Sequence, residues 1–306
     1  MMYRDYYFIT PQPPFRLDLT VWTLRRRADN TVDRWDDHTY RRVLDLPGGP
    51  VEVAVRQTGS VRQPKLRVAV FGRKLDSQMK ARVSLLLQRL LGLDLDLRWF
   101  YDLAREYPLL NQLAGDFRGM RPPRFATAFE AVINAIACQQ LTLTVGIRFL
   151  NRLSAAFGKK VDSPTAGRAF PGAEDLAAAP LSQLREMGFS GNKSRAIIEV
   201  AGRVACGELD LESLATQPDE AALAQLQSLR GVGRWTAEYV LLRSLGRVHI
   251  FPADDVGARN NLQRWLNIAE PLDYQGVHRA LGPWRSFGGL IYFHLLLRSL
   301  MEAGHI

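Results

Sequence analysis

Two adjacent carboxylates and two aromatic rings stand out as residues whose types and spacing could do chemistry. Asp254 and Asp255 follow an apolar segment and directly precede a predicted helix. N-capping of that helix suits Asp254, which leaves Asp255 free to point elsewhere. Trp235 and Tyr239 are four residues apart and therefore share one face of a helix. Core packing is the commoner explanation of such a pair, but near a carboxylate the rings could instead bind a flat or cationic group.

A glycine hairpin precedes the aromatic pair. Gly231 and Gly233 flank Val232, so the backbone can turn tightly there and approach another molecule closely. A new helix is predicted from about Arg234. Its first amides, from Gly233 to Thr236, have no partner inside the helix and lie at the positive end of its dipole. The pattern indicates an anion site that would fit a DNA phosphate, although a plain glycine-capped turn has the same sequence signature.

The elements that must position these residues change in type along the chain. Residues 1–74 are predicted to be β-rich, because apolar side chains alternate along residues 51–55 and 66–70. An apolar stripe with helical spacing over residues 76–92 indicates a helix. Beyond a basic extended linker at residues 120–124, almost the whole pattern is helical. The chemistry-bearing residues are therefore expected on helices and the loops between them.

Helix ends have recognisable signals in three places. Arg25-Arg-Arg-Ala ends a predicted helix, and we expect its charges to form a solvated face. Thr142 is expected to cap the helix that follows Gln139 and Gln140. Thr216-Gln-Pro-Asp-Glu starts the first helix of the hairpin, with proline and acids in its first turn.

Composition favours a globular protein with a polyanionic partner. The chain has 306 residues, 47% of them hydrophobic, and its 40 basic and 31 acidic residues give a net charge of +9. Two cysteines, Cys138 and Cys206, are too few for a disulfide framework or an iron–sulfur cluster held by four cysteines. The longest apolar run, residues 288–297, is too short to cross a membrane, and no signal peptide is recognised. We therefore expect a cytoplasmic protein, associated with the nucleoid if bacterial.

Several of these stretches together resemble a known family. Two stretches carry this resemblance, and they are Leu229-Arg-Gly-Val-Gly-Arg-Trp-Thr-Ala and Pro252-Ala-Asp-Asp. They resemble the hairpin and the Gly/Pro-rich loop with its essential aspartate of the helix-hairpin-helix (HhH-GPD) DNA glycosylase superfamily. The 3-methyladenine DNA glycosylase II (AlkA) type is indicated by Ile136-Ala-Cys-Gln-Gln-Leu-Thr, Gly188-Phe-Ser-Gly-Asn-Lys and Pro283-Trp-Arg-Ser-Phe. The resemblance is strong over about residues 120–298 and looser before them.

The resemblance implies a mostly α fold. A helix-hairpin-helix glycosylase module of two helical lobes, residues 104–306, would follow an N-terminal α/β domain of antiparallel sheet plus helices, residues 1–103. Lobe one would span about residues 128–247. Lobe two would combine about residues 104–127 with residues 248–306, and the active-site cleft would lie between the lobes.

The resemblance also implies an activity and its residues. The activity is release of alkylated bases from double-stranded DNA during base excision repair, by a monomer that flips the base out. Asp255 matches the catalytic aspartate, which either stabilises the cationic sugar or positions water. The residues that match the base pocket are Trp235, Tyr239 and Phe293. The loop that fills the gap in the duplex matches Gln139, Gln140 and Leu141. The phosphate-binding amides match those of Gly231, Gly233 and Thr236.

The resemblance further implies a structural Na⁺ or K⁺ ion and no catalytic cofactor. The carbonyls expected to hold this ion are those of Gln227, Leu229 and Val232. The lyase branches of the superfamily carry a lysine where this chain has Trp235, so we expect a monofunctional enzyme.

Some questions stay open at the sequence level. Gln140 occupies the position of the wedge residue, but Leu141 could serve if the register shifts by one. A DNA-binding protein without catalysis, a glycosylase for oxidised, deaminated or mismatched bases, and a metal nuclease using both aspartates are the alternatives. The nuclease is disfavoured because adjacent residues rarely chelate one ion together. Preference among alkylated bases is not determined.

Overall fold

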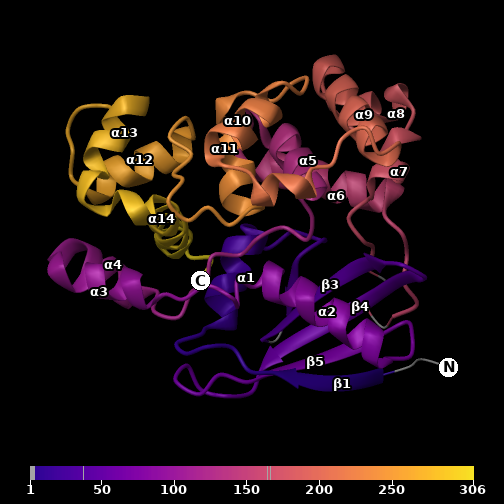
Figure 1. Ribbon diagram of the computed structural model, residues 1–306, viewed down its shortest axis with the longest axis horizontal. Helices are drawn as coiled ribbons and strands as arrows, with labels where there is room; N and C mark the ends of the chain where they lie inside the picture. The colour runs from indigo at the N-terminus through magenta and orange to yellow at the C-terminus, as the bar shows by residue number, and fades with distance from the viewer. Residues whose placement is uncertain (1–3, 37, 164, 166) are drawn as a thin grey trace.

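An antiparallel sheet and a set of helices divide the chain, as predicted (Figure 1). The computed structural model describes residues 4–36, 38–163, 165 and 167–306. The sheet has five strands in the order β1-β5-β4-β3-β2. Their bounds are β1 (Arg4–Ile9), β2 (Arg34–Asp36), β3 (Thr39–Leu46), β4 (Gly49–Gln57) and β5 (Leu66–Phe71).

Helices make up the rest of the regular structure that the described residues form. Those near the sheet or next to it in sequence are α1 (Leu17–Arg25), α2 (Ser77–Leu90), α3 (Arg98–Glu106) and α4 (Pro108–Asp116). The next group is α5 (Ala128–Cys138), α6 (Leu143–Phe157), α7 (Ala173–Ala177), α8 (Leu181–Glu186), α9 (Gly191–Ala205), η1 (Glu212–Thr216), α10 (Asp219–Gln227) and α11 (Arg234–Arg243). The last group is α12 (Val256–Trp265), α13 (Tyr274–Ala280), η2 (Gly282–Phe287) and α14 (Gly288–Glu302).

The sheet follows the alternation read from the sequence. β4 pairs antiparallel with β5, so that Val53 faces Val70 and Val55 faces Val68. All four of these valines are fully buried. Helix α2 lies across the sheet (Figure 1), and the carboxylate of Asp76 caps it by accepting the backbone N–H of Met79 at 2.7 Å.

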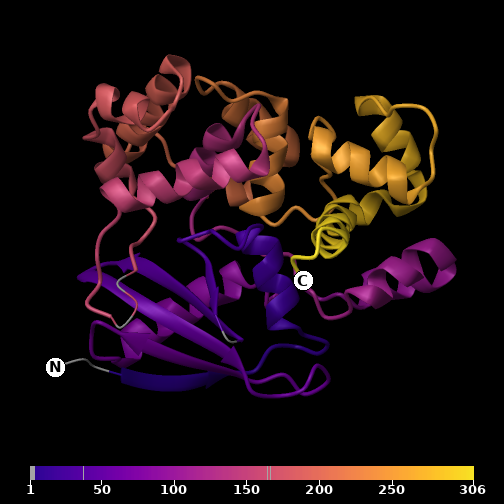
Figure 2. The same ribbon diagram turned by 180° about the vertical axis from the view of Figure 1, so that it is seen from behind.

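Two large apolar cores lie within the molecule. One runs from the sheet and α2 into α5, α6, α9 and α11. The other joins α3 and α4 to α12, α13 and α14, and these elements lie on the same side of the molecule in both views (Figures 1 and 2). Helix α11 is buried at every position from Thr236 to Arg243. This helix therefore forms the centre of the helical part.

Buried charges join the sheet to the helices. Arg42 on β3 forms ion pairs with Asp33 at 2.7 Å and with Glu130 on α5 at 2.5 Å. Burial is the main cause that raises the pKa of the Glu130 carboxyl, and Arg42 opposes it. Arg243 on α11 donates to the backbone carbonyl of Thr23 at 3.1 Å. The Arg42 pairs thus join the sheet to α5, and the Arg243 bond joins α11 to α1, which lies between the sheet and the helices (Figure 2).

The arginines at the end of α1 do not form the solvated face that we expected. Arg25 and Arg26 are 4% and 5% exposed. Arg25 donates to backbone carbonyls that lie beyond its helix, including that of Trp35 at 3.2 Å. The basic linker is likewise partly buried, since Arg121 is 1% exposed and donates to the carbonyl of Gln12 at 2.7 Å.

Among the described residues, no helix combines the length and the apolar character needed to cross a bilayer.

Candidate active site

The glycine hairpin joins α10 to α11 and leaves helix-start amides available. Gly231 has a φ of +76°, a conformation that side chains other than glycine rarely adopt. The first backbone bond of α11 is donated by Ala237 to Gly233 at 3.0 Å. The amides of Arg234, Trp235 and Thr236 therefore precede the first helical bond. A Cβ atom placed on Gly233 would meet nothing within 4 Å, so this face of the turn is open.

The loop after α5 is braced against the hairpin. The Nε2 group of Gln139 donates to the Gly231 carbonyl and to Thr236 Oγ1, both at 2.7 Å. The Nζ group of Lys193 in turn donates to the Gln139 carbonyl at 2.6 Å and to the Ala137 carbonyl at 3.2 Å. Burial lowers the pKa of the Lys193 ammonium group. Gln139 therefore positions the hairpin in this structure. Lys193, the last residue of the Gly188-Phe-Ser-Gly-Asn-Lys motif, links that motif to the Gln139 loop.

Gln140 and Leu141 occupy the exposed tip of the same loop. Gln140 is exposed and has a φ of +54°. Leu141 is 38% exposed, although it is a large apolar residue, and it lines the neighbouring cavity. Thr142 caps α6 as predicted, because its hydroxyl accepts the N–H of Val145 at 3.4 Å. Leu141 therefore lines the cavity directly, and Gln140 is its exposed neighbour in the same loop.

The predicted aspartate and aromatic pair surround one cavity. Its volume is about 400 Å³. The wall is built from α11, α12, α14, the α5–α6 loop and the end of α1. The lining residues are Arg26, Cys138, Leu141, Thr142, Leu143, Trp235, Tyr239, Asp255, Gly257, Ala258, Asn261, Tyr292, Leu296 and Ser299.

Asp255 is held by hydrogen bonds to both of its carboxylate oxygens. Oδ1 accepts the backbone N–H of Ala258 at 2.9 Å and thereby caps α12. Oδ2 accepts the indole N–H of Trp235 at 3.3 Å. The expectation that Asp254 caps this helix is wrong, since Asp254 instead pairs with Arg234 at 2.7 Å. Asp255 combines the capping role with a place in the cavity wall.

The two aromatic rings of α11 stack on one another. Their centroids are 5.4 Å apart, with an interplanar angle of 30°. Trp235 is half-buried and next to Asp255, whereas Tyr239 is 2% exposed and lies one turn further along α11. Burial raises the pKa of the Tyr239 hydroxyl. The pocket therefore has a continuous aromatic wall that ends in a protonated phenol.

The aromatic residue that α14 contributes is Tyr292 and not the expected Phe293. Tyr292 lines the cavity, and burial raises the pKa of its hydroxyl well above the usual value. Phe293 is fully buried. Its ring packs beside Arg243, whose guanidinium carbon lies 5.2 Å from the ring centroid. The register differs by one residue because both positions lie in a stretch of α14 that is buried without interruption from Gly288 to Leu295.

Several cavity residues were not expected from the sequence, among them Cys138 and Arg26. Cys138 lines the cavity, and burial raises the pKa of its thiol, which keeps it neutral. Arg26 reaches the cavity from the end of α1. The Arg26 side chain bonds to residues more than 100 positions away. For this reason the stretch Arg25-Arg-Arg-Ala does not show which of its arginines is buried and which is solvated.

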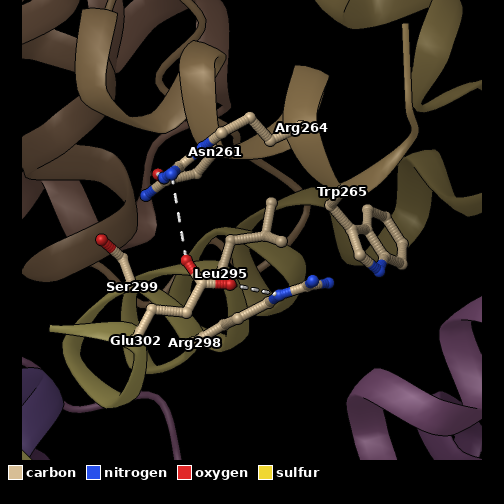
Figure 3. Close-up of a pocket in the computed structure, with 7 residues that line it drawn as sticks. All are labelled: Asn261, Arg264, Trp265, Leu295, Arg298, Ser299 and Glu302. Atoms are coloured by element: carbon tan, nitrogen blue, oxygen red, sulfur yellow. Dashed lines mark hydrogen bonds and ion pairs between the residues drawn. The ribbon is translucent and has the colours of Figure 1, made fainter. Parts of the chain in front are cut away.

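A second hollow of about 190 Å³ lies next to the cavity and shares Asn261 and Ser299 with it. Figure 3 shows that its charged groups are directed at one another. Glu302 accepts from Arg298 Nε at 2.9 Å and lies 3.9 Å from Arg264. Two arginines thus share the single carboxylate of Glu302, and we assign no ligand to this hollow.

Comparison with known proteins places the chain in a family. The model of the HhH-GPD superfamily base excision DNA repair protein matches residues 133–286, which is about half of the chain. The chain belongs to this superfamily.

Individual relatives extend the similarity to nearly the full length. A protein of Bacillus subtilis named DNA-3-methyladenine glycosylase is 29% identical over 295 residues, covering 95% of this chain and 96% of that protein. DNA-3-methyladenine glycosylase 2 of Escherichia coli is 25% identical over 289 residues, covering 92% of this chain and 94% of that protein. The structure of a 3-methyladenine DNA-glycosylase from Archaeoglobus fulgidus matches with a TM-score of 0.84 at 26% identity, covering 95% of this chain and 97% of that chain.

Proposed function

We propose that this protein is a monofunctional DNA glycosylase that releases alkylated bases of the 3-methyladenine type from double-stranded DNA. The observation that carries the proposal is the cavity in which Asp255 meets Trp235 and Tyr239 beside the glycine hairpin. Family membership and the names of the similar proteins support it.

DNA would be held through its phosphates by the hairpin. The amides at the start of α11 precede its first helical bond, and the open space at Gly233 lets a backbone approach them closely. Such contacts carry no sequence information, which suits an enzyme that searches for lesions in any context. The net charge of +9 favours the same partner.

The target nucleotide would be rotated out of the stack into the cavity. This costs a few kcal/mol and costs least for a damaged or mispaired base. Leu141 or Gln140, at the loop tip beside the cavity, would fill the gap that the base leaves. Gln139 is hydrogen-bonded to the hairpin, so it would hold the loop tip in a fixed position relative to the hairpin.

Asp255 would act on the sugar. Breaking the N-glycosidic bond places positive charge on the deoxyribose, and a carboxylate about 4 Å away lowers the energy of that charge by about 4 kcal/mol at an effective dielectric constant near 20. This corresponds to a rate factor of about a thousand. The hydrogen bonds from Ala258 and Trp235 fix the carboxylate before the substrate arrives. Positioning of the attacking water is a second task that the same carboxylate could perform.

The absence of lyase chemistry is part of the proposal. Among the described residues, those that line the cavity include no lysine. Lys193 is the lysine attached to the neighbouring loop, and its ammonium group is bonded to two backbone carbonyls. No amine is therefore placed to form a Schiff base with the sugar.

Alkylated purines suit the aromatic wall of the cavity. An N-alkylated purine with a positive charge leaves without a strong general acid, and it is attracted to ring faces by roughly 0.5–2 kcal/mol. Trp235 and Tyr239 offer such faces. Neutral lesions can stack on them as well, so the rings alone do not fix the substrate.

A monovalent cation at the hairpin is also part of the proposal. The carbonyl groups of Gln227, Leu229 and Val232 are neutral oxygen donors from one turn, a set that suits Na⁺ or K⁺. The Leu229 carbonyl accepts the N–H of Val232 at 3.1 Å and keeps a second lone pair. A bound ion would add positive charge beneath the amides that face the phosphate.

The test is a panel of duplexes that each carry one lesion, scored for free base and for strand cleavage. The panel contains 3-methyladenine, 7-methylguanine, 1-methyladenine, hypoxanthine and 8-oxoguanine. We expect release of alkylated bases without strand cleavage. Release of 8-oxoguanine alone, or cleavage that accompanies base release, would replace this proposal with an oxidised-base or lyase function.

A further inference from the structure

One face of the sheet carries exposed aromatic side chains. Tyr7 of β1 points toward α2, since its hydroxyl accepts a hydrogen bond from Ser84 of that helix at 3.0 Å. Successive residues of a strand point to opposite faces, so Tyr6 and Phe8 point away from α2. They are 56% and 45% exposed, although both are large aromatic residues. Helix α2 lies in front of the sheet in Figure 1 and behind it in Figure 2, so Figure 2 shows the face to which Tyr6 and Phe8 belong.

Basic side chains stand beside both rings. The Nζ atom of Lys65 lies 4.2 Å from the ring centroid of Phe8, and the guanidinium carbon of Arg67 lies 4.4 Å from that of Tyr6. Arg67 on β5 is the ladder partner of Arg56 on β4, so two positive charges are opposite each other on neighbouring strands. We call Tyr6, Phe8, Arg56, Lys65 and Arg67 the sheet patch.

The positive charges of the sheet patch are not balanced by carboxylates among the described residues. The carboxylates on neighbouring strand positions form their ion pairs elsewhere, Glu52 with Arg34, Asp36 with Arg41 and Asp45 with Lys159. Like charges that stand directly opposite in a sheet destabilise it. The pairing of Arg56 with Arg67 therefore does not serve the fold, and an anionic ligand would relieve the repulsion.

The two kinds of side chain in the sheet patch select the chemistry of its ligand. Cationic side chains attract phosphate groups, and exposed aromatic rings stack on the faces of bases. A base can also stack on a guanidinium plane such as that of Arg67. A single strand of nucleic acid offers a phosphate and an uncovered base face at each nucleotide. In a duplex the bases cover one another, and an acidic peptide brings negative charge without flat rings.

We propose that the sheet patch binds single-stranded DNA. Bases stack on Tyr6 and Phe8, and the phosphates are held by Arg56, Lys65 and Arg67. This is a second DNA-binding surface, because β1 lies at the opposite end of the molecule from α10 and α11 in both views (Figures 1 and 2). The inference goes beyond the proposed function, which uses the cavity, the Gln139 loop and the hairpin.

Fluorescence anisotropy of a labelled oligothymidylate with the full-length protein tests the charges. The double variant Arg56→Gln/Arg67→Gln should fold like the wild type, because it removes two like charges from exposed positions. We expect it to bind the single strand at least tenfold more weakly. The slope of log K against log salt should fall in magnitude by about 1.4, which is about 0.7 for each lost phosphate contact.

Lys80→Gln/Arg82→Gln is the matched control. It removes the same net charge from exposed positions of α2, which covers the other face of the sheet. We expect this variant to bind the oligothymidylate within about twofold of the wild type. Equal losses in the two double variants would show that only net charge matters and would overturn the inference.

Photocrosslinking locates the strand without relying on a variant. An oligonucleotide that carries 5-iododeoxyuridine is irradiated with the wild-type protein, and the crosslinked peptides are identified by mass spectrometry. We expect crosslinks at Tyr6 or Phe8. Tyr6→Thr/Phe8→Thr should lose these crosslinks and bind at least tenfold more weakly, while Tyr6→Phe, which keeps the ring, binds like the wild type. Crosslinks confined to the hairpin would contradict the inference.

Two competitors and one activity assay separate this claim from its alternatives. Equal loss of duplex binding in Arg56→Gln/Arg67→Gln would assign the sheet patch to duplex DNA, and displacement of the oligothymidylate by polyglutamate at equal charge would assign it to acidic proteins. Either result would overturn the inference. We expect the same variant to release 3-methyladenine from a duplex at the wild-type rate. A wild-type protein that releases no base would contradict the proposed function and leave the binding measurements as they are.

Discussion

Asp255 shows at the scale of one residue what the sequence could and could not determine. The pair Asp254–Asp255 predicted a helix start, which the structure confirms, and a catalytic carboxylate. The catalytic role stays a prediction, and Asp255 lines the cavity. The sequence predicted that Asp254 caps α12, whereas Asp255 caps it in the structure. Both have the same capping preference, and only the path of the backbone decides between them. Because Oδ1 makes the cap, Oδ2 is left for Trp235 and the cavity.

A buried histidine should make the stability of the protein depend on pH. His294 on α14 is 1% exposed, and its Nδ1 lies 2.7 Å from the carbonyl of Leu290. Burial lowers the pKa of its imidazole from 6.5 to about 4. Between pH 4 and pH 6.5 the unfolded chain therefore binds a proton at this histidine that the folded chain does not bind. We expect the free energy of unfolding to fall by about 3 kcal/mol as the pH is lowered from above 6.5 to 4.

Denaturant unfolding at a series of pH values measures this effect. His294→Leu replaces the imidazole with an apolar group among its aromatic neighbours Phe100 and Phe117. We expect the variant to lose most of the slope between pH 6.5 and 4, whatever its stability at neutral pH. A wild-type slope that persists unchanged in the variant would show that another group titrates in this range.

At the scale of elements, the hairpin was predictable and the register of α14 was not. The two glycines, the helix before them and the helix after them lie where the sequence placed them. Helix α14 is buried on all sides over most of its length, so it has no polar face to fix its rotation. This is why Phe293 was expected in the pocket, whereas Tyr292 is the residue that lines it.

A substitution in the glycine hairpin should weaken DNA binding without lowering the stability of the fold. At Gly233 an added side chain meets open space and the backbone is extended, so Gly233→Thr should fold normally and keep a suitable helix cap. The side chain would occupy the space through which a phosphate approaches the amides. We expect binding to undamaged duplexes of unrelated sequence to weaken by about tenfold, or ~1.4 kcal/mol, in each case.

Gly231→Ala is the contrasting variant. Its φ of +76° costs an alanine about 1–2 kcal/mol, and the new Cβ would lie 3.0 Å from that of Ala196. We expect it to lower stability as well as binding. If Gly233→Thr binds like the wild type, or weakens binding to only one sequence, the hairpin is not the phosphate contact.

At the scale of the whole molecule, the pocket is assembled from parts that lie far apart in the sequence. Trp235 and Tyr239 come from α11, Asp255 from the start of α12, Tyr292 from α14 and Arg26 from the end of α1. The sequence predicted the sheet, the helical part and most of this set because local patterns mark them. It did not predict Arg26, because a buried arginine is specified by partners such as Tyr239, which is 213 positions away.

Contacts of two buried arginines make the N-terminal part of the chain a support for the pocket. Arg42 links β3 to α5 through Glu130, and Arg243 links α11 to the last turn of α1. Because α5 leads into the Gln139 loop and Arg26 directly follows α1, these contacts reach both sides of the cavity. The domain bounds at residues 103 and 104 stay a prediction, but the pocket itself spans them.

Base release by Asp255→Asn tests the central claim most directly. Asparagine caps a helix as well as aspartate, so the variant should fold and bind DNA like the wild type. We predict that single-turnover release of 3-methyladenine from a duplex falls by about a thousandfold, while Asp254→Asn, whose side chain pairs with Arg234, stays within a few-fold of the wild type. Release at the wild-type rate by Asp255→Asn would contradict the account.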